Sequence, residues 1–360
     1  MLNTIKMAGK YLDQPLLVGK FSKAVPATLI GGSALYTAHE VKKAPEGHKK
    51  HVAINTALIL GATSAAALAA PKVAAKLVGR PYEKVNLNKI RQNNTKLVDE
   101  FLSSNKVSKP VETILDKART KVLKIKEIAT LNKEIGKTEN GKKFMNAFVP
   151  EPENVTSKDI VKDMARLSIL GAMPVAGGIA GGIAGDMITD KPNWKKKLPN
   201  KIKEGAYQYL ANIFLCNVGA AGALGILEAA KVKSKAARAA GMVAGILTTG
   251  VIGGSTIANY ISKKVINPLF DGKNSKKAGK DEGLYSERKP EALDICLHSD
   301  DIATIAVMSG FKWIEPSLPI LYAISGYRSG IGYRNGDKGH HNHHNQTKVE
   351  HNNLQQVKSK

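Results

Sequence analysis

The sequence predicts an all-α integral membrane protein with Gly/Ala-rich spans and a polar helical insert. Long stretches without ionisable side chains alternate with Lys-rich connections, and many glycines recur at helical spacing. Runs that alternate β-branched and polar residues between hairpin turns are nearly absent, which disfavours strands. The chain has 360 residues, of which 43% are hydrophobic, so it has enough apolar material for a folded core.

Five windows without charged side chains define the expected spans. A helix needs about 20 residues to cross about 30 Å of hydrocarbon, and all but the first window approach or exceed that length. The windows are residues 24–38, 52–71, 167–185, 205–227 and 239–262. A sixth stretch, residues 302–327, contains Lys312 and Glu315 followed by two prolines. We therefore expect it to be a broken segment at the membrane interface.

These windows divide the chain into six parts. We expect a basic amino-terminal segment with a membrane hairpin, a polar and basic helical insert, a Gly-rich three-helix membrane bundle, a linker, a broken interfacial segment and a disordered His-rich tail. In the same order, their bounds are residues 1–71, 72–166, 167–262, 263–300, 301–336 and 337–360.

The glycines of the bundle predict close helix packing. Gly177, Gly181 and Gly185 are four residues apart, and Gly241 and Gly245 repeat that spacing. Residues at this spacing share one helix face, where the lack of bulky side chains lets two backbones approach each other closely. In a soluble surface helix each glycine would be unfavourable by about 1 kcal/mol relative to alanine. A tightly packed soluble helix and a Gly-rich loop are the alternatives.

The polar insert reads as helical. Apolar residues recur at spacings of four and three from Val111 to Ala129, after a start signal at Ser108 and Pro110. This single stripe predicts one helix that packs on its own chain or lies on a membrane surface. An earlier, weaker helix is expected to end near Ser103 and Ser104.

The net charge of +24 restricts the partners to anions. Anionic membrane lipids are the preferred partners, and a homo-oligomer is compatible with the glycine faces. Nucleic-acid binding is not favoured, because aromatic residues make up only 5% of the chain and are not interleaved with the basic runs. Every connection is basic, so the sidedness of a multi-pass membrane protein stays open. Re-entrant hairpins and a soluble protein with an alanine-rich core are the alternatives, and a cleaved signal peptide is not favoured.

Two segments combine aromatic and basic residues in a manner typical of a membrane interface. Trp194 directly precedes Lys195, Lys196 and Lys197. Near the carboxyl end a six-residue repeat contains Tyr327 and Arg328 and then Tyr333 and Arg334. Rings of this kind lie at the headgroup level and guanidinium groups bind phosphate, so we expect both segments to contact lipid. A solvated basic loop and a plain turn-rich segment are the structural alternatives.

Two other groups of residues have possible polar roles. The tail contains a histidine cluster, His340, His341, His343 and His344, which permits weak metal capture. A flexible polar tail without defined geometry is the stronger interpretation. Asp186 and Asp190 lie one turn apart at the end of the third window. They mark a polar boundary or, less favoured, part of an ion path.

No catalytic motif is recognisable, and no cofactor is expected. The sequence has no nucleotide-binding loop, no HExxH and no GxSxG signature. The favoured function is a noncatalytic membrane scaffold or assembly protein, which packs through Gly/Ala faces and binds anionic lipid through its basic connections. The alternative is a small-solute or ion channel or transporter, with the Gly-rich helices as pore walls. That function requires polar or ionisable groups at membrane depth, and the windows offer mainly uncharged ones such as Asn212 and Asn217.

Overall fold

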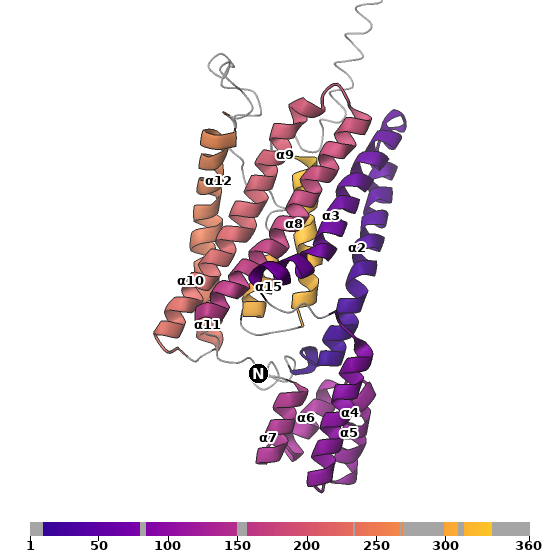
Figure 1. Ribbon diagram of the computed structural model, residues 1–360, viewed down its shortest axis with the longest axis vertical. Helices are drawn as coiled ribbons and strands as arrows, with labels where there is room; N and C mark the ends of the chain where they lie inside the picture. Colours follow the sequence, from indigo (N-terminus) through magenta and orange to yellow (C-terminus); the bar gives the residue numbers. More distant parts are fainter. Residues whose placement is uncertain are drawn as a thin grey trace, which may run out of the picture.

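The computed structural model describes residues 10–79, 84–149, 157–232, 235–266, 268, 299–308 and 313–332. Within these ranges the protein is all-helical and contains no strand, which confirms the predicted secondary-structure class. Long helices form a bundle, and four short helices, α4 to α7, form a separate group at one end of it (Figure 1).

The first two long helices form an antiparallel hairpin along one side of the bundle (Figure 1). They are α2 (Pro15–Lys43) and α3 (Lys49–Val78), joined by the short 3-10 helix η1 (Glu46–His48). Pro15 lies in the first turn of α2, where its missing N–H is not needed. Gly79 ends α3 in the left-handed region at φ 69°, a conformation that glycine adopts without steric penalty.

The four short helices form a polar unit with an apolar core of its own. Asn86 caps α4 through two backbone N–H groups, and Thr138 caps α7 through the N–H of Gly141. The core includes Val98, Leu115 and Phe144. The four helices are α4 (Leu87–Ser104), α5 (Lys109–Thr120), α6 (Ile125–Glu134) and α7 (Glu139–Phe148).

The single helix predicted from Val111 to Ala129 is in fact two helices. α5 ends at Thr120, α6 begins at Ile125, and the four residues between them are not helical, with Lys121 and Lys124 extended. The break turns Leu123 into the core, where it is fully buried. It also places the backbone of Leu123 against Gln14, so a long-range contact overrides a continuous local pattern. The earlier helix, α4, ends at Ser104 as expected.

Gln14 connects the polar unit to the hairpin. Its Nε2 donates to the carbonyl oxygen of Leu123 at 2.9 Å, and its Oε1 accepts from the N–H of Leu123 at 2.8 Å. The side chain is only 1% exposed, so both backbone groups of Leu123 are satisfied inside the protein.

The remaining helices complete the bundle around α8, which lies at its centre (Figure 1). The chain from α9 to α10 is one long helix with a π-helical turn, and a second π-helical stretch divides the window at 239–262. The elements are α8 (Ser157–Thr189), α9 (Trp194–Tyr209), η2 (Leu210–Phe214), α10 (Leu215–Ala229), α11 (Lys235–Gly245), η3 (Ile246–Gly254), α12 (Ser255–Ile261), η4 (Ser262–Ile266), α15 (Ser299–Met308), η6 (Glu315–Ser317) and α16 (Leu318–Ile331).

Two glycine faces of α8 contact two different helices. Gly177, Gly181 and Gly185 lie against α3, where an added Cβ would overlap atoms of Ala62, Leu58 and Asn55, respectively. The adjacent glycines Gly178 and Gly182 lie against the carbonyl oxygens of Gly326 and Gly330 on α16. Backbone therefore meets backbone on both sides of α8, and no larger residue fits there without movement.

The other two predicted packing glycines, Gly241 and Gly245, lie on α11. Gly245 faces Gly219 of α10 so closely that a Cβ on either residue would overlap the carbonyl oxygen of the other. Gly241 contacts the side chain of Leu227, also on α10. The α10–α11 contact thus has the same backbone-to-backbone character as the contacts of α8.

Three helical stretches among the described residues are long and apolar enough to cross a membrane. They are Glu46–Val78, Lys158–Thr189 and Trp194–Ala229, and they contain the second, third and fourth predicted windows. The stretch at 302–327 is interrupted as predicted, because α15 ends at Met308 and α16 begins at Leu318. α16 nevertheless packs against α8 and α3 inside the bundle, since its small residues fit the second glycine face of α8.

Candidate functional site

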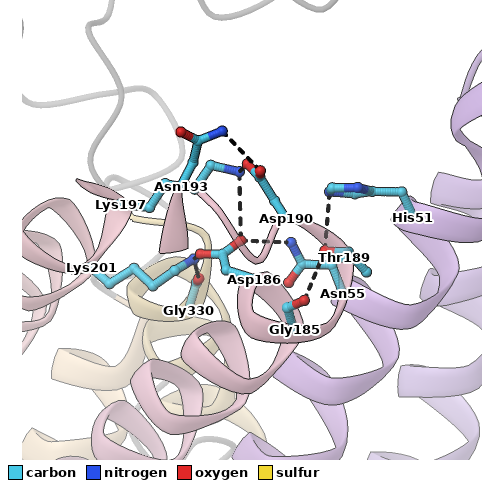
Figure 2. Close-up of polar contacts among 10 residues, drawn as sticks. All are labelled: His51, Asn55, Gly185, Asp186, Thr189, Asp190, Asn193, Lys197, Lys201 and Gly330. Atoms are coloured by element: carbon cyan, nitrogen blue, oxygen red, sulfur yellow. Dashed lines mark hydrogen bonds and ion pairs between the residues drawn. The ribbon is translucent and has the colours of Figure 1, made fainter. Parts of the chain in front are cut away.

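Four helix ends meet at one end of the bundle and bring polar side chains together (Figure 2). α3 begins here, α8 ends, α9 begins and α16 ends. We call this group the charge cluster. Its members are His51, Asn55, Asp186, Thr189, Asp190, Asn193, Lys197 and Lys201, together with the backbone carbonyl of Gly330.

A buried ion pair lies at the centre of the charge cluster. Nζ of Lys201 is 3.1 Å from Oδ2 of Asp186, and the two side chains are only 4% and 2% exposed. Lys201 also donates to the carbonyl oxygen of Gly330 at 2.5 Å, and Asn55 donates to Oδ1 of Asp186 at 3.3 Å. The pair therefore ties α3, α8, α9 and α16 together, with hydrogen bonds that offset part of the desolvation of both charges.

A second layer of the charge cluster lies nearer to the surface. Nζ of Lys197 is 2.7 Å from Asp190 and 3.8 Å from Asp186, and it is 42% exposed. The amide of Asn193 donates to Asp190 at 2.9 Å. The hydrogen bond from Lys197 holds the pKa of Asp190 below its ordinary value, and the amide of Asn193 adds to this effect against the opposing influence of partial burial.

Local sequence explains how these side chains reach one another. The spacing of four residues places Asp186 and Asp190 on one face of the end of α8, and Lys197 and Lys201 on one face of α9. The turn between the helices is short, so the two faces oppose each other. Gly185 leaves room for Asn55, because a Cβ at Gly185 would overlap the Asn55 amide.

A second buried ion pair lies one turn further along α9. Oε1 of Glu204 is 3.7 Å from Nη2 of Arg328 on α16, with side chains 2% and 11% exposed. Lys203 beside it is also buried. Glu204 accepts a hydrogen bond from Gln208, so polar contacts continue from the charge cluster into the apolar part of the bundle.

The predicted lipid-contact residues separate into two groups. Lys195 and Lys196 are exposed, and Nζ of Lys195 lies 5.6 Å from the centroid of the half-buried Trp194 ring. Tyr327 packs edge-on against Tyr36 at 5.1 Å between ring centroids. Lys197 and Arg328 instead point toward buried carboxylates.

Several predicted site residues lie outside the described residues. These are Tyr333, Arg334, His340, His341, His343 and His344. Within the described residues, no group of three or more His, Cys, Asp or Glu side chains is arranged to hold a metal ion.

Sequence reasoning identified Asp186 and Asp190 but missed the ion pairs. Lys201 and Glu204 lie between the third and fourth predicted windows, where they read as ordinary charged residues of a connection, and Arg328 was assigned to lipid contact. One signal was present in the sequence. Two aspartates spaced by four precede the α8–α9 turn and two lysines spaced by four follow it, which indicates that the two pairs face each other. Arg328 comes from more than a hundred residues away, so its partner was not visible in any local pattern.

No protein-family model, no curated protein and no solved structure matches this chain. The class of protein therefore rests on the fold and the site alone. It is an all-helical protein whose bundle has closely packed glycine faces, buried ion pairs near one end and a polar four-helix unit at the other.

Proposed function

We propose that this protein is a noncatalytic membrane scaffold, in which the bundle is the membrane anchor and the polar unit, α4 to α7, is held at one face. The observation that carries the proposal is that both glycine faces of α8 are closed within the chain, by α3 and by α16. Such contacts give a rigid bundle, because neither face can slide or open without separating two backbones. They also leave those faces unable to line a pore.

The distribution of apolar side chains supports a membrane location. Large apolar residues are exposed on the outer faces of several long helices, including Ile30, Leu35, Ile188, Ile226 and Leu247. Charged side chains of α8, α9 and α16 form two ion pairs inside the bundle. Apolar outside and ionic inside is the arrangement expected of helices dissolved in lipid.

Anionic lipid is the partner that we propose for the basic connections. Lys195 and Lys196 are exposed beside Trp194 at the start of α9. An aromatic ring with two exposed ammonium groups suits the headgroup region, where each lysine near an anionic surface contributes about 1 kcal/mol. Assembly with a second copy would use faces that stay open, such as that of Gly31 and Gly32 on α2.

Two experiments test the scaffold proposal. The protein should stay in the membrane pellet after carbonate extraction, and release into the supernatant would refute the anchor. In detergent, phosphatidylglycerol should raise the melting temperature of the wild type more than that of a Lys195→Gln, Lys196→Gln variant. The matched control is Lys106→Gln with Lys109→Gln, two lysines at the α4–α5 turn of the polar unit. Equal lipid responses of all three proteins would contradict the assignment to Lys195 and Lys196.

A channel or transporter is the second candidate function, and one observation favours it. Glu204 and the amides that follow it place polar groups inside the bundle, beyond the charge cluster. A permeation pathway requires polar groups at this depth, and the uncharged windows showed only the amides, because Glu204 lies just outside the window at 205–227.

A further inference from the structure

Buried polar side chains follow one another along the helix formed by α9, η2 and α10. Nε2 of Gln208 donates to Oε1 of Glu204 at 2.8 Å, and Nδ2 of Asn212 donates to Oε1 of Gln208 at 3.0 Å. Further along, Oδ1 of Asn217 accepts from the hydroxyl of Thr304 on α15 at 3.4 Å. All five side chains are at most 5% exposed. We call Glu204, Gln208, Asn212, Asn217 and Thr304 the polar row.

The polar row is long enough to cover most of the hydrocarbon thickness of a bilayer. With a rise of about 1.5 Å per residue, the helix from Glu204 to Asn217 measures about 20 Å, compared with a hydrocarbon thickness of about 30 Å. One end of the row adjoins the charge cluster, whose outer members Lys197 and Asp190 are partly exposed. The row therefore extends from a hydrated end deep into the apolar bundle.

One member of the polar row indicates that water enters it. Nδ2 of Asn217 has no hydrogen-bond partner in the described part of the chain, although the side chain is only 1% exposed. A buried amide donor without an acceptor is costly, so such groups are normally satisfied by ordered water. The π-helical turn η2 contains Asn212 and ends at Phe214, before Asn217, and turns of this kind are frequent at functional sites.

The charges of the cluster and the row decide which species could use this path. Charged groups lie around it on several neighbouring elements. They are His51 on α3, Asp186 and Asp190 at the end of α8, Lys197, Lys201, Lys203 and Glu204 on α9, Lys263 on η4, Arg328 on α16 and the buried Asp301 on α15. Asp186, Asp190 and Glu204 each have a cation beside them, so these three carboxylates present no uncompensated negative charge to a metal cation. A proton needs only water and groups that bind it in turn.

We propose that the polar row is a water-filled path for protons, entered from the charge cluster, with Glu204 as its proton-binding group. A hydronium ion at the cluster end transfers a proton to the carboxylate of Glu204. An O–H bond breaks on the hydronium, an O–H bond forms on Glu204, and water remains. Glu204 then gives the proton to the next water, beside Gln208 and Asn212, so the O–H bond on Glu204 breaks, the carboxylate is restored and that water becomes hydronium. This proposal rests on the membrane placement proposed above.

The test uses the full-length protein in vesicles of phosphatidylcholine and phosphatidylglycerol with a pH-sensitive dye inside. After an external acid pulse with valinomycin and potassium present, wild-type vesicles should acidify faster than protein-free vesicles. Gln208→Leu, which keeps the size and removes the amide, should slow acidification by about tenfold, equivalent to about 1.4 kcal/mol in the barrier. Gln208→Glu should restore the rate. Thr248→Val is the control, because Thr248 is exposed and bonds only its own helix backbone.

The outcomes separate this proposal from the scaffold function. Protein that floats with the vesicles but gives no flux above protein-free vesicles overturns the proton path and leaves the anchor intact. Protein that does not float refutes the membrane placement and, with it, the path. If Gln208→Leu does not insert, Glu204→Gln serves instead, since it keeps the size of the side chain. An unchanged rate in the inserted variant overturns the role of the row.

Discussion

Lys201 and Asp186 form an ion pair that is almost completely removed from solvent, with Nζ and Oδ2 separated by 3.1 Å. The pair joins α9 to α8, and its hydrogen bonds extend to α3 and α16. Because a pair buried in this way gains little over well-packed apolar residues, stability alone is a weak reason for its presence. Its value lies in fixing which helix ends meet at the charge cluster.

Removing one partner of this pair should destabilise the protein strongly. Lys201→Met leaves Asp186 buried and without its main counter-charge, so we expect a loss of about 3–5 kcal/mol in the free energy of unfolding. The double variant Asp186→Asn, Lys201→Met should recover most of this loss, because no uncompensated charge remains. Denaturant unfolding in detergent measures both effects. Lys195→Met on the exposed side of α9 is the control, and an equal loss in that variant would contradict the argument.

The glycine contacts of α8 should respond sharply to one added methyl group. At Gly178 a Cβ would overlap the carbonyl oxygen of Gly326, so Gly178→Ala should destabilise the bundle by about 1–3 kcal/mol through overpacking. At Gly61 on α3 an added Cβ would meet no other atom within 4 Å. Gly61→Ala should therefore be neutral or stabilising by up to about 1 kcal/mol, since alanine is the better helix former. Thermal unfolding of the two variants side by side checks the contrast, and similar shifts in both would refute close packing at Gly178.

The contact between Gln14 and Leu123 should control the attachment of the polar unit. Gln14→Leu keeps the buried volume but leaves the N–H and carbonyl of Leu123 without partners, which costs about 1–3 kcal/mol for each such group. We expect faster hydrogen exchange at the Leu123 amide and a lower melting temperature. Gln92→Leu, at an exposed position on α4, is the matched control. Unchanged protection of Leu123 in Gln14→Leu would show that the contact does not hold the unit in place.

Local patterns predicted the elements of this fold better than their partners. The second, third and fourth uncharged windows identified the helices that are long and apolar enough to cross a membrane, because composition and length determine which segments suit lipid. The windows 24–38 and 239–262 do not lie in such helices. The spacing of Gly177, Gly181 and Gly185 marked a face for close approach but not the helix that covers it. That helix is α3, and the adjacent face of Gly178 and Gly182 is covered by α16, which follows about 140 residues later.

The charge cluster shows why the rest was not visible in the sequence. Asp186 was noticed as a polar boundary, yet its partner Lys201 lies past a turn whose geometry determines whether the two meet. Glu204 and Arg328 come from distant segments and pair only after the bundle has assembled. The break between α5 and α6 had the same cause, because Gln14 satisfies the backbone of Leu123 where a continuous helix was expected.

The acid dependence of stability should reveal the outer layer of the charge cluster. The hydrogen bond from Lys197 lowers the pKa of Asp190 in the folded protein, so the folded state favours the ionised carboxylate more than the unfolded state does. The stabilisation is therefore fully present above the unfolded-state pKa of about 3.9 and is lost as the pH falls through the lower folded pKa. The melting temperature of Asp190→Asn should lie below that of the wild type near neutral pH, and the two should converge in acid. Lys197→Met should also lower the melting temperature near neutral pH and remove the acid-dependent part of the stability, because Asp190 then lacks the hydrogen bond that lowers its pKa. A constant difference between wild type and Asp190→Asn across this range would show that the carboxylate gains nothing from its ionised form in the fold.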